Sequence, residues 1–86
     1  MNVELSSTGA AYIRYATSAS ACNLFVGGDE DSDVIVDLDD AGNVIGIEIL
    51  DVTVQADIER ARVFARERDL PFPRDLAAAA RDLSAA

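Results

Sequence analysis

Residues 33–51 constrain the fold more than any other part of the chain, because they read as two strands joined by a tight turn. Apolar side chains recur at every second position in both runs, which is typical of β-strands. The segment Asp40-Ala41-Gly42-Asn43 between the runs favours a type I turn with Gly42 in the left-handed region. The sequence therefore predicts a β-hairpin with strands at 34–39 and 44–50. Its inward-facing positions are Val34, Val36, Leu38, Ile45, Ile47 and Ile49.

Shorter alternating runs predict three more strands before this hairpin, at 2–6, 10–16 and 21–26. After Val52 the apolar spacing changes to that of a helix, which we expect to begin with Asp51 or Thr53 as its cap. The Leu-Pro-Phe-Pro sequence at 70–73 is expected to end this helix, because a residue before proline is disfavoured in helical conformation. A second helix is predicted over 74–84.

These elements predict an α+β fold, with a small antiparallel sheet of four to five strands followed by a C-terminal helical hairpin packed on one face. We expect a single domain over 1–86, with a β-rich part at 1–53 and a helical extension at 54–86. The predicted core consists of Ile13, Leu24, Val34, Val36, Ile45, Ile47, Ile49, Ile58, Phe64 and Leu76.

Charge is distributed unevenly along the chain. The formal net charge is −9, and all of it falls on residues 1–53, where Arg14 is the only basic residue. An acidic surface repels phosphate backbones and anionic bilayers, so we expect no nucleic-acid and no membrane partner. The single cysteine, Cys22, cannot form an internal disulfide, and we expect it to be buried in its strand. With no signal peptide apparent, a cytoplasmic protein is expected.

The chain contains no histidine, which removes the commonest general base and a common metal ligand. We therefore expect no enzyme, no cofactor and no metal centre. The spacing of Asp37, Asp39, Gly42 and Glu48 is close to that of a calcium-binding loop. Strands rather than helices flank it, and Ala41 stands where a ligand is needed, so we interpret it as the hairpin turn. The acidic run 29–33 is interpreted as a solvated loop.

Two blocks resemble the bacterial domain of unknown function 2283 family over roughly residues 2–53. The first is Ala11-Tyr12-Ile13-Arg14, and the second runs from Asp37 through the turn to Val44-Ile45-Gly46-Ile47-Glu48-Ile49-Leu50-Asp51. The acidic residues that usually precede the first block in the family are absent here. The resemblance implies a small β-rich domain without an established reaction, and a hint that some members are partners of toxin-like proteins.

The leading functional expectation is a protein–protein interaction module, in the form of an antitoxin-like neutraliser of a basic partner. One alternative is a self-assembling subunit, expected to be a homodimer, and another is a weak carboxylate site for divalent metals. Arg14 and Glu48 are expected to face each other if their strands pair. The candidate partner-binding residues are Arg14, Asp37, Asp39, Asp40, Glu48, Arg62 and Arg66.

Overall fold

A computed structural model describes residues 1–27, 32–74 and 76, and in these it has five strands and one α-helix. The predicted α+β class and antiparallel sheet are confirmed. The second helix predicted over 74–84 falls almost wholly on residues outside the described ones. The elements in chain order are β1 (Asn2–Leu5), β2 (Ala11–Arg14), β3 (Cys22–Phe25), β4 (Val34–Leu38), β5 (Val44–Ile49) and α1 (Gln55–Glu67).

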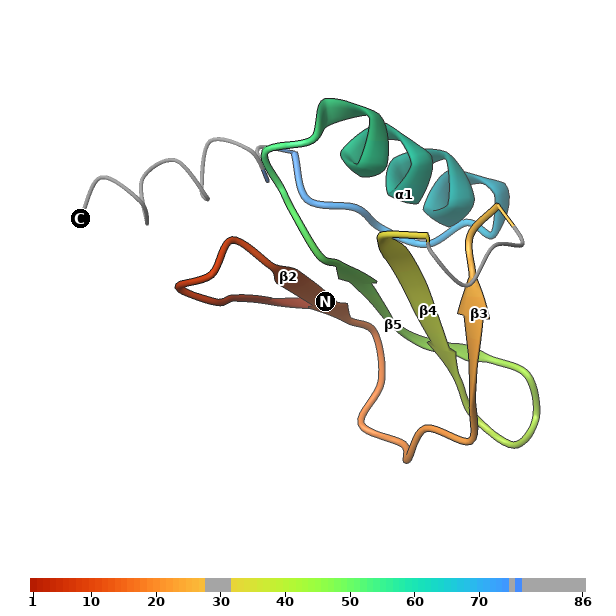
Figure 1. Ribbon diagram of the computed structural model, residues 1–86. Helices are drawn as coiled ribbons and strands as arrows, with labels where there is room; N and C mark the ends of the chain where they lie inside the picture. Colours follow the sequence, from red (N-terminus) through yellow and green to blue (C-terminus); the bar gives the residue numbers. More distant parts are fainter. Residues whose placement is uncertain (28–31, 75, 77–86) are drawn as a thin grey trace.

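The sheet has the strand order β1-β2-β5-β4-β3, and every neighbouring pair is antiparallel. Consecutive strands are paired except β2 and β3, whose connection runs past the end of the sheet to its far edge (Figure 1). Among the described residues, strand pairing therefore joins the β1–β2 hairpin to β3, β4 and β5 only between β2 and β5. In that pairing Ile13 lies opposite Ile47, which lies opposite Val36 of β4 on its other side.

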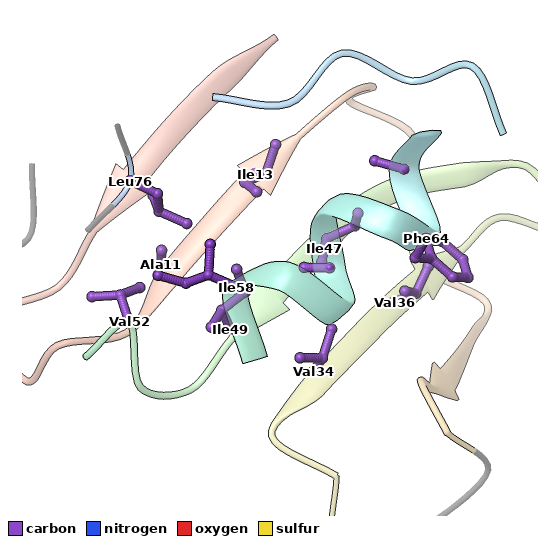
Figure 2. Close-up of a cluster of buried hydrophobic side chains, with 12 residues drawn as sticks. Ala11, Ile13, Val34, Val36, Ile47, Ile49, Val52, Ile58, Phe64 and Leu76 are labelled. Atoms are coloured by element: carbon purple, nitrogen blue, oxygen red, sulfur yellow. The ribbon is translucent and has the colours of Figure 1, made fainter. Parts of the chain in front are cut away.

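One face of the sheet carries the core. The inward side chains of β2, β4 and β5 pack beneath α1, which contributes Ile58 and Phe64 (Figure 2). Burying one aliphatic side chain of this size contributes roughly 1.5–3 kcal/mol, so these positions stabilise the fold most. Ala61 and Ala65 let the helix lie close to the strands, since both are fully buried. The side chains with no exposed surface in the sheet are Ile13, Val34, Val36, Ile47 and Ile49.

The chain after α1 turns back and packs on another part of this face. Leu70 and Phe72 pack against the core, and Leu76 is buried in it beside Ala11 (Figure 2). The Tyr15 hydroxyl donates a hydrogen bond of 2.7 Å to the carbonyl oxygen of Pro71. Burial raises the pKa of Tyr15 to about 12. The segment after the helix is therefore part of the domain.

Both ends of α1 differ from the expectation. Its N-cap is Val54, which has no side-chain cap, because the Asp51 carboxylate accepts hydrogen bonds from the backbone and hydroxyl of Thr53 instead. The helix ends before the prolines, in a Schellman arrangement in which Leu70 N–H donates to the Ala65 carbonyl oxygen. Asp69 occupies the left-handed position of this motif, with φ of 56°.

Two predictions about β3 are wrong. Leu24 was expected in the core but is 39% exposed, and Cys22 is exposed as well. The reason is topological, because β3 is an edge strand and α1 packs on β4 and β5. The other nine predicted core residues are buried, although Ile45 lies outside the main cluster.

The turns of the β1–β2 and β4–β5 hairpins have the same design. In the second, the Asp39 carbonyl oxygen accepts from Gly42 N–H at 3.0 Å, and Gly42 has a φ of 83°. In the first turn, the Ser6 carbonyl oxygen accepts from Gly9 N–H at 3.2 Å, and Gly9 has a φ of 93°. A side-chain oxygen of the first residue also accepts two backbone N–H groups in each turn. The predicted left-handed conformation of Gly42 is confirmed. The closing hydrogen bond starts at Asp39, one residue before the predicted turn segment 40–43.

Candidate functional site

The sheet surface opposite α1 is called the open face here, because no described part of the chain packs on it (Figure 1). Its residues follow from the strand registers, which place side chains of five strands on one side. Apart from Gly46, all of them are half-buried or exposed. The open face comprises Asn2, Glu4, Tyr12, Arg14, Asn23, Phe25, Ile35, Asp37, Gly46 and Glu48.

A hydrogen bond that crosses an entire strand lies at the centre of the open face. The Tyr12 hydroxyl on β2 donates to Asp37 Oδ2 on β4 at 2.9 Å, passing over Gly46 of β5. A Cβ atom added to Gly46 would lie 1.9 Å from the Tyr12 hydroxyl oxygen, so only glycine leaves room for this crossing. The pKa of Tyr12 rises to about 12, first through burial and then through the hydrogen bond to Asp37.

Arg14 extends this network toward the edge of the sheet. Its guanidinium carbon lies 4.9 Å from the centroid of the Tyr12 ring, and its Nη2 lies 3.6 Å from Glu4 Oε2. A cation over an aromatic ring at an exposed site contributes about 0.5–1 kcal/mol. These contacts therefore link side chains of β1, β2 and β4 across the open face.

The structure brings together three of the seven candidate partner-binding residues. Arg14, Asp37 and Glu48 share the open face. The strands of Arg14 and Glu48 do pair, but Arg14 lies opposite Gly46 and its ion pair is with Glu4. The expectation that Arg14 and Glu48 face each other is therefore wrong, because the residue opposite Glu48 is Tyr12.

Asp39 and Asp40 lie apart from this group, at the tip of the β4–β5 hairpin. The Asp39 carboxylate accepts from the backbone N–H groups of Ala41 and Asn43, each at 2.9 Å, and from the Asn43 amide. The backbone hydrogen bond from Asn43 is the main reason that the pKa of Asp39 lies below its usual value of 3.8. Its oxygens thus hold the turn, and Asp40 is exposed beside it.

Arg62 and Arg66 belong to α1, on the other side of the sheet from the open face. Arg62 forms an ion pair with Glu59 and its guanidinium carbon lies 5.6 Å from the centroid of the Phe72 ring. It helps to fix the returning segment on the helix. Arg66 is exposed in the last turn, where a positive charge suits the helix dipole.

The most important residues of the open face that sequence reasoning did not select are Tyr12 and Gly46. A glycine inside an alternating strand marks a place where another group approaches the backbone closely, and Gly46 carries that signal. The group that approaches it lies far earlier in the chain, so its identity depends on the pairing of β2 with β5.

A hollow at the edge of the open face, beside Tyr12 and Glu48, is small. Its volume is about 180 Å³, whereas pockets for drug-sized ligands span roughly 300–1,000 Å³. Within residues 1–27, 32–74 and 76, no group of three or more His, Cys, Asp or Glu side chains is placed to hold a metal ion. In the same part of the chain, no helix is long and apolar enough to cross a bilayer.

Comparison with known proteins gives one match. No curated protein and no solved structure matches the chain significantly. The family model described as "Protein of unknown function (DUF2283)" matches residues 8–52, slightly more than half of the chain. The match covers β2 to β5, including Tyr12, Asp37, Gly46 and Glu48, and leaves β1 and α1 outside. The resemblance seen in the sequence is thereby confirmed, and the chain belongs to the DUF2283 family of proteins of unknown function.

Proposed function

We propose that this protein is a protein–protein interaction module whose open face binds a basic protein. The observation that carries the proposal is a wide sheet surface, left uncovered by the described chain, on which polar side chains are already fixed in place. A surface ordered before binding loses less conformational entropy when a partner docks. A flat, shallow surface of this kind suits a macromolecule better than a small ligand.

The charge of the open face favours a basic partner. Glu4, Asp37 and Glu48 contribute three carboxylates, and Arg14 is the only cation among them. Arg14 is also engaged by Glu4 and by the Tyr12 ring, which leaves the acidic groups to dominate. Complementary charge accelerates encounter and selects among partners. Neutralisation of a compact basic protein by covering its working surface, an antitoxin-like role, is the form of this function that size and charge favour.

Catalysis is not part of the proposal. The chain has no histidine, and the Tyr12 phenol keeps its proton through the physiological range because its pKa is raised. The acidic open face also argues against binding to nucleic acid, whose phosphates it would repel.

The test is capture from the protein's own cells with a matched pair of charge variants. Glu48→Lys reverses a charge on the open face, and Glu67→Lys makes the same change of net charge at the exposed end of α1. We expect a basic protein to co-purify in a fixed ratio with the wild type and with Glu67→Lys, and to be lost with Glu48→Lys. It should also dissociate as salt rises. A partner that binds all three forms equally would contradict the open face as the binding surface.

A further inference from the structure

The outer edge of β3 differs from the rest of this acidic protein. Residues 21–26 contain no charged side chain, in a chain with 16 acidic and 7 basic residues. Natural sheets usually protect an edge strand with charges, prolines or bulges, because an unprotected edge pairs with other strands. The opposite edge, β1, has such protection in Glu4, which forms an ion pair with Arg14. The edge at β3 is therefore the one suited to pairing.

The backbone of β3 also presents hydrogen-bonding groups outward. Val26 N–H donates to the Val34 carbonyl oxygen on β4 at 3.0 Å. In an antiparallel pair alternate residues direct both backbone groups to the same neighbour, so Leu24 also faces β4. Asn23 and Phe25 consequently direct their N–H and C=O groups to the outer side, where the described chain has no strand.

We propose that β3 pairs with β3 of a second copy, antiparallel and around a two-fold axis, so that two sheets become one continuous sheet. The outward groups select the register, since Asn23 then exchanges both hydrogen bonds with Phe25 of the second copy. Leu24 lies directly opposite Leu24 of the second copy, as a close pair without backbone hydrogen bonds between them. This covers a large apolar side chain that is 39% exposed in the single chain.

The lack of charge on β3 favours a second copy as its partner. An uncharged strand places no like charges opposite each other when it meets its own copy, although the rest of each chain is acidic. Two grooves of about 440 and 460 Å³ flank β3 on the helix side. The first includes Leu24, the second includes Val26, and both reach Phe64. Side chains of the second copy lie at the mouths of these grooves.

This inference is independent of the proposed function, since it uses the edge of the sheet and not the open face. A two-fold axis perpendicular to the sheet keeps both open faces on the same side, so the dimer doubles the acidic surface. Salt should affect self-association and partner binding in opposite directions. Each copy carries a net charge of −9, so salt screens the repulsion between two copies and strengthens the dimer. Salt also screens the attraction to a basic partner and weakens that complex.

The first test measures the mass in solution by analytical ultracentrifugation over a range of protein and salt concentrations. We expect the wild type to form a dimer that strengthens with salt. Leu24→Asp places two carboxylates opposite each other and should lower the association constant about tenfold or more. Val54→Asp, at an exposed apolar residue before α1, makes the same charge change away from β3 and should remain a dimer. Circular dichroism checks that both variants are folded.

A second test fixes the register and does not depend on weakening the dimer. Leu24→Cys in a Cys22→Ser background places two thiols opposite each other, at a Cα separation of about 4.5 Å that suits a disulfide. Mild oxidation should yield a covalent dimer from this variant and none from the wild type, whose Cys22 lies opposite Val26 of the second copy. A monomeric wild type at every concentration, or a Leu24→Asp variant that stays dimeric, would overturn the proposal. Failure of the Leu24→Cys variant to cross-link would overturn the register.

Discussion

The Tyr12 side chain crosses β5 directly above Gly46, and this crossing joins two strands that are not neighbours. Tyr12 starts on β2 and its hydroxyl reaches Asp37 on β4, while β5 runs between them. A glycine in a strand normally weakens it, since it has no side chain to pack and loses more backbone freedom on folding. Here the absence of a side chain at Gly46 leaves room for the Tyr12 side chain to lie across β5.

Gly46→Ala should therefore destabilise the protein, although alanine suits a strand better than glycine. The new Cβ would overlap the Tyr12 hydroxyl and ring, and overpacking of this kind costs about 1–3 kcal/mol. Urea unfolding followed by circular dichroism measures the change. Tyr12→Val removes the overlapping group, so Gly46→Ala should cost little in that background.

Tyr12→Phe serves as the control in this double-mutant cycle. It removes only the hydroxyl, and the ring carbon Cζ of residue 12 would still lie 2.2 Å from the new Cβ. We expect Gly46→Ala to remain costly in the Tyr12→Phe background. Equal costs of Gly46→Ala beside tyrosine and beside valine would show that the crossing does not explain the glycine.

The ultraviolet titration of this protein should lack an ordinary tyrosine. The chain has two tyrosines, and both have a pKa raised from 10.0 to about 12. The absorbance of tyrosinate near 295 nm should therefore stay flat around pH 10, where an unfolded chain ionises. The folded pKa of each tyrosine lies above its unfolded value. The contribution of the two tyrosines to the free energy of unfolding is therefore fully present below about pH 10 and is lost as the pH rises through about 12. A rise of one residue's absorbance centred at pH 10 would contradict this arrangement.

Asp39 should make the hairpin turn sensitive to acid. Its folded pKa is lowered, so its contribution to stability is complete above its unfolded value near 3.8 and is lost as the pH falls through the folded value. Asp39→Asn cannot titrate, and we expect it to be less stable than the wild type at pH 7, with a difference that shrinks in acid. Asp40→Asn makes the same charge change at the next residue, for which the described structure has no side-chain hydrogen bond, and should leave the stability at pH 7 nearly unchanged.

Asp69→Gly should stabilise the protein. Asp69 has a φ of 56° at the end of α1, a conformation that glycine adopts without the steric cost of a Cβ atom. Removing an acid near the negative end of the helix dipole acts in the same direction. We expect a gain of about 0.5–1 kcal/mol in the free energy of unfolding. Asp69→Ala removes the charge but keeps the Cβ, so a gain with alanine as large as with glycine would exclude the backbone explanation.

The hairpin and most of the core could be predicted from the sequence because they rest on local alternation. Ile47 and Ile49 share a face whatever their neighbours are, and both are buried as expected. The position of β3 at the edge could not be predicted in this way, since exposure of Leu24 depends on strand order. Local alternation is the same for a central strand and for an edge strand.

The ends of α1 and the open face also could not be predicted from local sequence pattern. The Asp51 carboxylate was a good cap by sequence, but it serves the preceding turn, and the choice between these partners depends on the path of the backbone. Arg14, Asp37 and Glu48 were selected by residue type, and the register places them on one face. Tyr12 reaches Asp37 over Gly46 only because β5 lies between β2 and β4, a relation that no local pattern contains.

The pairing of β2 with β5 has a consequence for how fast the chain folds. The β1–β2 hairpin and the β3–β4–β5 meander each form from contacts close in sequence, whereas β2 and β5 bring residue 11 to residue 49. The entropy cost of closing so long a loop arises before the contacts between β2 and β5 can offset it. Non-local pairing of this kind slows folding. We therefore expect the docking of Ile13 against Ile47 to be the slow step, so that their truncation lowers the refolding rate, while Asp69→Gly chiefly slows unfolding.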